Sequence, residues 1–439
     1  MSYYPPAQGG YGYPYPPQQQ YAAGAPIPGY PVMQQQPPPH PQQQGYYPPQ
    51  GPPPGSAPIG APGYSYYPQP QGPPMHQPPP PPAPYGYPAP APPAPMMPSV
   101  LPAVTMPVSH APTMPMQPQS YFAPGTGGPV PTPQQDAETI HRACKGFGTD
   151  ERSVISVVAC RTSEHLASVT SVYKQFYGRD LVEVLDKETS GHFGRALHYL
   201  ILPPIVLDAE LLHEAVVGAG TNERCLIQIL VGRSNADMAQ LKNMYYARYH
   251  KNLESVVRGD VSGYFEKLLT ICIQGTRDEF GQYQYNVEAD VHSLYKAGEG
   301  RIGTDESHFI HVLTNRPDAH LRAVFQQYQS RYGKKFTKVI KKEFSGWIKT
   351  ALCYLVNWIY NPAHCIAKNL EKSMEGMGTD DKQLTRLLVR NRAQPFMNSV
   401  KAAYLLKYRR SLRDRVKGET SGDYRRTLLS TIGEPEHHH

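Results

Sequence analysis

The chain has 439 residues and a formal net charge of +7, but charged side chains are confined to one part of it. Residues 1–135 contain no Asp, Glu, Lys or Arg, so all 42 basic and 35 acidic residues lie from Asp136 onward. Only six of the 50 prolines follow residue 135. This division excludes one uniform globular domain and predicts two segments of different physical character.

The N-terminal segment, residues 1–133, is rich in Pro, Tyr, Gly and Gln, in loose repeats such as YGYPYPP and GYSYYPQPQG. Such a composition cannot bury enough aliphatic surface to offset the chain entropy lost on folding, so we predict a disordered tail. Its start lacks both basic residues and an apolar run, which predicts no signal peptide. The tail is either a spacer or an interaction segment, because tyrosines spaced among prolines suit aromatic-groove partners and self-association.

The remaining part of about 300 residues is long enough for a well-buried core. Its modest positive excess suits an anionic partner, either a membrane or a nucleic acid. The six cysteines form no CxxC pair, which favours reduced thiols in a cytosolic protein over disulfides. The most apolar stretch, residues 351–360, is too short to span a bilayer, so any membrane contact is expected to be peripheral.

A glycine motif recurs four times in this part: GFGT at 146–149, GAGT at 218–221, RIGT at 301–304 and GMGT at 376–379. The glycines that precede the threonines are 72, 83 and 75 residues apart. A period of this size predicts stacked supersecondary units. We therefore expect repeats at 134–203, 204–276, 277–360 (with a linker at its start) and 361–436.

The same helix is predicted to begin after each Gly-Thr pair. The positions five, six and nine beyond the threonine are apolar in every copy except at Thr385; they hold Val154, Ile155, Val158, Leu226, Ile227, Leu230, Phe309, Ile310, Leu313, Leu384 and Leu388. This spacing is the apolar stripe of an α-helix. The threonine is expected to be the N-cap, and the glycines to end the preceding helix. No segment alternates as strands do, so the core is predicted to be all-α.

A second motif, acid-x-Ser-Gly, lies far downstream in every copy, with its acid at Glu188, Asp260, Glu343 and Glu419. The acid follows the threonine by 39 residues in three copies and by 40 in the fourth. Taken singly, the glycine motif is a good helix-to-helix turn and the acid a good helix cap, and neither needs a ligand. Their fixed pairing indicates a cluster of loop carbonyls and one carboxylate, the hard oxygens that Ca²⁺ prefers.

With these paired motifs, the chain from Pro133 to Glu436 resembles the annexin family. The resemblance implies five helices per repeat and four repeats in a slightly curved disc, with calcium sites on its convex face that bind acidic phospholipid membranes. The implied ligands are loop carbonyls and the downstream acid of each repeat: Cys144, Gly146, Gly148 and Glu188; Val216, Gly218, Gly220 and Asp260; Gly298, Arg301, Gly303 and Glu343; Met374, Gly376, Gly378 and Glu419. One carboxylate per ion predicts weak single sites, which lipid phosphates complete and which act together through multivalency.

The residues at the loop tips have two interpretations. They either pack against neighbouring loops or enter the headgroup layer of a membrane. These residues are Phe147, Ala219, Ile302 and Met377.

A set of arginines follows the threonines by twelve residues, with a shift in the fourth repeat; they are Arg161, Arg233, Arg316 and Arg392. We expect them to form interhelical salt bridges. The family resemblance also places Asp208, Arg233 and Arg386 along a polar channel. Gln228 stands there in place of a common glutamate, which weakens the case for ion conduction.

The extra residue of the fourth copy is expected in the loop between Arg390 and Pro395. An insertion within a regular helix would rotate Glu419 by about 100° away from its loop. Proline disfavours a continuous helix before it, and a loop absorbs one residue at little cost.

Enzymatic activity is not expected, because the sequence has no P-loop, HExxH motif or nucleophile elbow. An EF-hand sensor is excluded by the missing D-x-D-x-D-G loop. The alternative function is a basic scaffold with a low-complexity tail that binds polyanions or RNA without calcium. The tail also resembles those of long-tailed annexins, which engage penta-EF-hand partners. We expect a cytoplasmic protein that is peripheral on membranes when calcium rises and has no specific nucleic acid partner.

Overall fold

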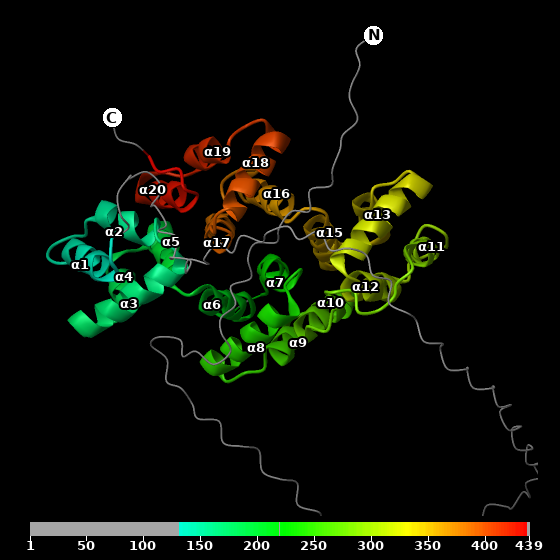
Figure 1. The fold of residues 1–439 in the computed structure, drawn as a ribbon, viewed down its shortest axis with the longest axis horizontal. Helices are drawn as coiled ribbons and strands as arrows, with labels where there is room; N and C mark the ends of the chain where they lie inside the picture. Colours follow the sequence, from blue (N-terminus) through cyan, green and yellow to red (C-terminus); the bar gives the residue numbers. More distant parts are fainter. Residues whose placement is uncertain (1–130, 219, 437–439) are drawn as a thin grey trace, which may run out of the picture. The chain divides into compact units, whose positions relative to one another are not determined.

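The structure is a computed structural model that describes residues 131–218 and 220–436. Residues 1–130 of the predicted tail and Ala219 lie outside the described residues. The described part contains twenty α-helices and no strand, which confirms the all-α fold class (Figure 1). None of these helices combines the length and apolarity that crossing a bilayer requires.

The helices form four groups of five along the chain. The first group comprises α1 (Pro133–Ala143), α2 (Glu151–Val158), α3 (Ser163–Tyr177), α4 (Leu181–Glu188) and α5 (Gly191–Ile201). The second comprises α6 (Pro204–Val216), α7 (Glu223–Leu230), α8 (Asn235–Tyr249), α9 (Leu253–Asp260) and α10 (Gly263–Gln274). The third comprises α11 (Val287–Ala297), α12 (Glu306–Asn315), α13 (Asp318–Tyr332), α14 (Phe336–Glu343) and α15 (Gly346–Tyr360). The fourth comprises α16 (Pro362–Met374), α17 (Asp381–Arg390), α18 (Phe396–Tyr408), α19 (Leu412–Glu419) and α20 (Gly422–Thr431).

In each repeat the helix that follows the glycine motif packs its apolar stripe into the core. All the residues of the predicted apolar stripe are buried, from Val154 to Leu388. Thr385, the polar exception, is buried as well, and its hydroxyl lies 2.9 Å from that of Tyr424. A buried hydroxyl with a partner avoids the cost of an unsatisfied polar group, so the stripe tolerates this exception.

The N-cap prediction is wrong by one residue in every repeat. The caps are Asp150, Asn222, Asp305 and Asp380, each of which follows the threonine and accepts a hydrogen bond from the third residue of its helix. A carboxylate or amide oxygen caps a helix as well as a hydroxyl does. The threonine hydroxyl is thereby free for another contact.

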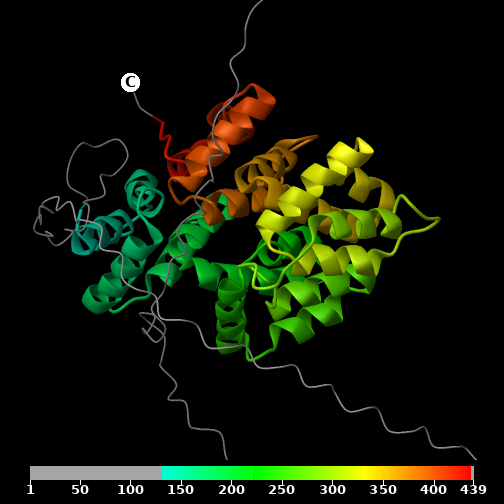
Figure 2. The ribbon, with the colours of Figure 1, turned by 45° about the vertical axis from the view of Figure 1, so that its right-hand side comes forward.

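Helix contacts join the first repeat to the fourth and the second to the third, and α15 of the third repeat packs against α16 of the fourth. Helix α5 packs against α17 and α20, and α2 packs against α20 (Figure 1). Helix α10 packs against α12 and α15, and the green helices of the second repeat lie beside the yellow helices of the third in Figure 2. The buried apolar residues form two clusters, one that spans the first three repeats and one that is centred on the fourth.

The predicted interhelical salt bridges form in the first three repeats. Arg161 pairs with Asp136 at 2.7 Å, Arg233 with Asp208 at 2.6 Å and Arg316 with Asp290 at 2.9 Å. These pairs join the segment just after the second helix of a repeat to its first helix, and the carboxylates are nearly buried. For the first three repeats the expectation is confirmed.

The fourth repeat differs because Ile366 stands where the other repeats have the aspartate. Its Arg392 instead donates to the hydroxyl of Ser163 and the carbonyl of Leu200, both in the first repeat. Arg390 crosses to the second repeat and binds Asp208 at 2.5 Å. The arginines of the fourth repeat therefore bind other repeats.

The extra residue of the fourth repeat lies between α17 and α18, in residues 391–395, as predicted. In the first repeat the corresponding segment, between α2 and α3, is residues 159–162. The helices after the insertion keep their register, so Glu419 still reaches its loop: the hydroxyl of Thr379 donates to Glu419 Oε2 at 2.8 Å.

Candidate metal sites

The threonine of each glycine motif donates a hydrogen bond to the downstream carboxylate. The four bonds are Thr149 to Glu188 at 3.3 Å, Thr221 to Asp260 at 2.6 Å, Thr304 to Glu343 at 2.7 Å and Thr379 to Glu419 at 2.8 Å. In the first three repeats the same hydroxyl also donates to the backbone carbonyl of the acid. The structure therefore brings each predicted acid to its predicted loop.

The loops have a left-handed backbone at their glycines. In the first repeat Gly146 has φ 116° and Gly148 has φ 87°, and the glycines of the second and fourth repeats have nearly the same values. Non-glycine residues rarely adopt such angles, and this requirement explains why two glycines recur in these loops. A backbone hydrogen bond from Asp150 N to Ala143 O, 2.9 Å long, closes the turn, and each other repeat has its counterpart.

The first loop and its acid are electrostatically coupled. Cys144, at the end of α1, has its thiol pKa raised to about 11, first by burial and then by the negative charge of Glu188. Since this thiol stays protonated at neutral pH, Cys144 offers its backbone carbonyl rather than a thiolate. The first predicted ligand set therefore contains oxygen atoms only.

The third loop has a different shape, and its motif is RIGT where the other repeats have a glycine in place of the arginine. Gly298 ends α11, and its carbonyl accepts a hydrogen bond from Arg301 N at 3.1 Å. A Cβ atom on Gly298 would lie only 3.3 Å from Cγ of Glu343, so the loop backbone and the acid side chain are in contact. Gly303 carries the single left-handed turn of this loop, with φ 80°.

A further carboxylate, which the sequence reasoning missed, stands beside the third loop. The side chain of Glu299 is nearly buried, accepts a hydrogen bond from the Tyr328 hydroxyl at 3.1 Å and pairs with Lys334. Lys342 lies 3.6 Å from Glu299 and 3.6 Å from Glu343. The spacing of the motifs could not predict that Glu299 is buried, because Glu299 belongs to neither of the two recurring motifs.

The donor set fits calcium better than a softer metal. The described residues contain no group of three or more His, Cys, Asp or Glu side chains that could hold an ion. Any ion at the loops would be held by backbone carbonyls and one carboxylate, with open positions left for ligands from outside. Hard oxygens with flexible geometry are what Ca²⁺ binds.

The fourth loop has an occupant of its own. Arg415 of α19 contacts the carboxylate of Glu419 and the carbonyl oxygen of Met374, which are two of the four predicted ligands. The sequence reasoning did not single out this residue. Helices α4, α9, α14 and α19 occupy equivalent places in the four repeats. A comparison of them would have marked Arg415, because the other three have valine at its position.

The described loop tips are fully exposed. Phe147, Ile302 and Met377 have relative accessibilities of 111%, 101% and 108%. They make no packing contact with neighbouring loops that would hide them from solvent, so the first of the two interpretations is not supported in this structure. Large apolar side chains left in water at several loop tips are a feature of surfaces that meet another phase or partner.

The residues compared with a polar channel form one buried cluster between the second and fourth repeats. Arg386 donates to the side-chain oxygen of Gln228 at 2.8 Å, and Gln228 donates to Gln383 at 3.3 Å. Asp208 joins Arg233 and Arg390 at the same interface. Each of these groups has a partner, so the cluster serves at least as an inter-repeat polar contact.

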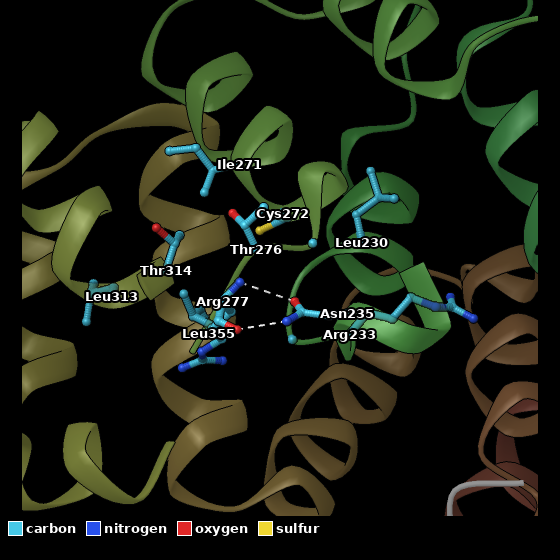
Figure 3. A pocket seen from close by; sticks show the side chains of 12 residues that line it. Leu230, Arg233, Asn235, Ile271, Cys272, Thr276, Arg277, Leu313, Thr314 and Leu355 are labelled. Carbon is cyan, nitrogen blue, oxygen red and sulfur yellow. Dashed lines mark hydrogen bonds between the residues drawn. The ribbon is translucent and has the colours of Figure 1, made fainter. Parts of the chain in front are cut away.

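A small cavity lies where the linker before α11 meets the second repeat (Figure 3). Asn235 fixes the linker by two bonds to the backbone of Arg277, one from its amide to the carbonyl at 2.7 Å and one accepted from the amide N–H at 3.2 Å. The cavity measures about 30 Å³, which is room for one or two water molecules. It is too small for an organic ligand.

The fold and the loops define a class: an all-α protein of four repeats, each with a glycine-rich loop bound to a distant carboxylate. The annexin family profile matches residues 135–200, 207–271, 289–355 and 366–431, which together exceed half of the chain. This chain belongs to the annexin family.

Individual relatives agree with this assignment. The chain is 40% identical to annexin A11 of Oryctolagus cuniculus over 302 residues, which cover 69% of this chain and 60% of that protein. It is 40% identical to annexin A13 of Mus musculus over 299 residues, which cover 68% of this chain and 94% of that protein. The solved structure of annexin III has a TM-score of 0.67 at 34% identity and covers 72% of this chain and 98% of its own. The structure of calcium-bound annexin (Sm)1 has a TM-score of 0.62 at 31% identity and covers 70% and 91%.

Proposed function

We propose that this chain binds acidic phospholipid membranes reversibly and peripherally when calcium rises. The observation that carries the proposal is the hydrogen bond from each loop threonine to its distant acid, made in all four repeats. That bond holds a carboxylate beside a loop of carbonyls, which is the arrangement a calcium ion needs. Calcium would neutralise the carboxylate and offer its open positions to lipid phosphate oxygens.

The repetition of the site supplies the strength of binding. A single ion held by one carboxylate binds weakly, and the ion and a lipid phosphate complete each other's coordination. Several such bridges from one molecule raise the overall affinity through effective concentration. The exposed apolar side chains at the loop tips would add contacts with the headgroup layer.

The setting of this activity is also a proposal. The chain acts in the cytoplasm, in membrane organisation or trafficking, and moves to membranes when calcium rises. Its tail binds penta-EF-hand or aromatic-groove proteins, or other copies of itself, through tyrosines spaced among prolines. The annexin A11 match covers 60% of that relative's length, so these whole-protein roles rest on the composition of the tail.

The decisive experiment is vesicle co-sedimentation of the full chain. We expect it to pellet with phosphatidylserine vesicles in calcium, to stay in solution in chelator, and to ignore phosphatidylcholine vesicles in both. Equal pelleting in calcium and in chelator at physiological salt would overturn the proposal. A steep loss of that calcium-independent binding with added salt would favour the polyanion scaffold instead.

Two double variants distinguish the loss of ligand carboxylates from the loss of the same negative charge elsewhere on the same helices. Glu188→Gln combined with Asp260→Asn removes two predicted ligand carboxylates and should raise the calcium requirement. The control combines Glu183→Gln with Glu254→Gln, which changes the charge equally on the same helices α4 and α9. An equal effect of both pairs would show that net charge, not ligation, controls binding.

A further inference from the structure

One position distinguishes the fourth repeat from the other three. Four residues before the ligand acid the first three repeats have Val184, Val256 and Val339, whereas the fourth has Arg415. A valine side chain has no hydrogen-bond donor, so it cannot engage the acid or the loop. The guanidinium of Arg415 carries five donors and a permanent positive charge.

The guanidinium lies where the fourth site would hold an ion. One terminal nitrogen donates to Oε1 of Glu419, and the other donates to the carbonyl oxygen of Met374. The family resemblance assigns both oxygens to calcium. Both are engaged by a cation that belongs to the chain itself.

A second departure in the same repeat holds the arginine in place. Its Nε atom lies 3.4 Å from Oε2 of Glu371, a residue of α16, and Glu371 accepts a hydrogen bond from the hydroxyl of Tyr404. The other repeats have an aromatic ring at the position of Glu371. Each ring stacks on the second tyrosine of a Tyr-x-x-x-Tyr pair, in the couples His141–Tyr177, His213–Tyr249 and Tyr295–Tyr332.

The two departures match each other. The fourth repeat has an acid in place of the aromatic ring and an arginine in place of the valine. The two side chains form an ion pair where the other repeats have a stacked ring, and Arg415 Nε makes no hydrogen bond there with any described residue. The Arg415 side chain is only 17% exposed, and three oxygen-bearing groups surround it. Charge-assisted contacts of this kind are stronger than those of neutral groups.

The lysine beside the third site provides a contrast. Lys342 lies 3.6 Å from Glu343, but its side chain is 63% exposed. An exposed, flexible lysine gains little from such a contact and leaves it at little cost. Arg415, by comparison, is part-buried and bound on both sides of the site.

We propose that Arg415 competes with calcium for the fourth site, so that this repeat takes up an ion only by displacing its own guanidinium and is the last of the four to fill. The proposal rests on the proposed function, since it presumes that the other loops bind calcium. In chelator the arginine neutralises Glu419 and stabilises the empty loop. The protein would therefore respond to calcium in two steps, three sites first and the fourth at a higher concentration.

The test measures calcium bound per chain by equilibrium dialysis, with the full chain on phosphatidylserine vesicles. For the wild type we expect the last ion to bind at a concentration about tenfold above the others, which corresponds to about 1.4 kcal/mol. Arg415→Val, which installs the valine of the other repeats, should bring that ion into the main phase. Arg413→Val is the matched control, because it removes the same charge from the same helix at a side chain whose ion pair, with Asp414, is 4.0 Å long.

A second readout does not depend on lipid. In chelator Arg415→Val should lower the thermal unfolding midpoint, because Glu419 loses its cation, and millimolar calcium should then raise that midpoint more than it does for the wild type. Glu371→Gln keeps the arginine but loosens its hold, and it should shift the last ion part of the way. If Arg415→Val does not fold, the calcium isotherm of Glu371→Gln tests the proposal.

The outcomes are distinct. If the wild type and Arg415→Val give superimposable calcium isotherms and Glu371→Gln does too, the competition does not exist and the proposal is wrong. If the isotherms of the wild type and all variants show no bound calcium, the proposed function itself fails, and the proposal falls with it.

Discussion

The hydroxyl of Thr221 lies 2.6 Å from Oδ2 of Asp260, although the two residues are 39 positions apart in the chain. The same hydroxyl lies 3.2 Å from the backbone carbonyl of Asp260. A carboxylate held in this way loses little conformational entropy on binding an ion, because its side chain is already ordered in the folded protein. The loop and the acid thus form one preorganised unit.

Replacing Thr221 with valine tests this relationship. Thr221→Val keeps the side-chain shape and removes the donor, so Asp260 loses its positioning bond. We expect the calcium requirement of that site to rise about fivefold, for a loss of about 1 kcal/mol. The measurement is a calcium titration of vesicle co-sedimentation.

The control for this substitution is Thr270→Val in α10. The Thr270 hydroxyl oxygen is buried and has no hydrogen-bond partner among the described residues, so the same chemical change there removes no bond. Equal calcium requirements for Thr221→Val and Thr270→Val would show that the hydroxyl does not position the acid.

Asp208 is expected to be the most costly carboxylate to remove. It is buried and pairs with Arg233 of its own repeat and Arg390 of the fourth. Asp208→Asn leaves two part-buried arginines without their anion, and we expect a loss of about 3–5 kcal/mol in unfolding free energy. Urea denaturation measures it, with Glu183→Gln at an exposed position of α4 as the control. A loss below 1 kcal/mol would contradict the assigned role.

The pH dependence of Asp208 follows from its environment. Burial acts to raise its pKa, but the charges of Arg390 and Arg233 outweigh burial and lower it. Because the folded pKa is depressed, this stabilisation is complete above the ordinary aspartate pKa of about 4 and is lost as the pH falls through the folded value. The difference in unfolding free energy between the wild type and Asp208→Asn should therefore be constant around neutral pH and should decrease only in acid.

His198 should give the opposite dependence. It lies between Asp186 of α4 and Glu210 of α6, and its hydrogen bond to Glu210 raises its pKa despite the burial of the ring. The raised folded pKa makes its contribution complete below about pH 6.5, and the contribution disappears as the pH rises through the folded value. We expect His198→Gln to destabilise the protein more at pH 5.5 than at pH 8.5.

The repeats and the loop–acid pairs could be predicted because they recur at fixed spacing, and recurrence survives in a single sequence. The capping by Asp150 rather than Thr149 could not, because both side chains can cap a helix and only the three-dimensional position of Glu188 decides which one does. The spacing shows which residues pair within a repeat, but not which residues meet between repeats.

Two contacts illustrate this limit. Arg390 binds Asp208 across 182 residues, and no periodicity links those positions. Arg415 was not singled out from the sequence, and only the structure places Met374 and Glu419 around it. A comparison of equivalent positions would have marked Arg415 as unusual, but it would not have shown which oxygens it binds.

Removing the tail tests the division of the chain. Thr132 and Gln135 form a capping box at the start of α1, with the Thr132 N–H donating to Gln135 Oε1 at 2.8 Å. Deletion of residues 1–130 keeps this box, so lipid binding and stability should stay unchanged while self-association or vesicle aggregation changes. Deletion of residues 1–133 should cost about 1 kcal/mol more, the typical loss of an N-cap. Thermal unfolding of the two truncations checks this, and an unfolded or non-binding protein after the shorter deletion would contradict it.

The loop tips carry the last prediction. Phe147 and Ile302 are fully exposed, so replacing them with alanine removes no packing in the protein alone and should leave unfolding unchanged. If the tips enter the headgroup layer, each alanine substitution removes apolar surface that the membrane would bury. Full burial of a side chain of this size contributes about 1.5–3 kcal/mol to binding.

We therefore expect Phe147→Ala with Ile302→Ala to weaken vesicle binding at saturating calcium by about tenfold or more, while calcium binding without lipid is unchanged. The control is Phe280→Ala, which removes an 86% exposed phenylalanine from the linker before α11. The same loss for Phe280→Ala would mean that any exposed aromatic residue contributes. A drop in stability of the double variant would mean that the tips pack within the protein, and either result would remove the case for insertion. Because the double variant keeps every carbonyl and carboxylate at the loops, a selective loss of membrane affinity would separate apolar contact from calcium bridging.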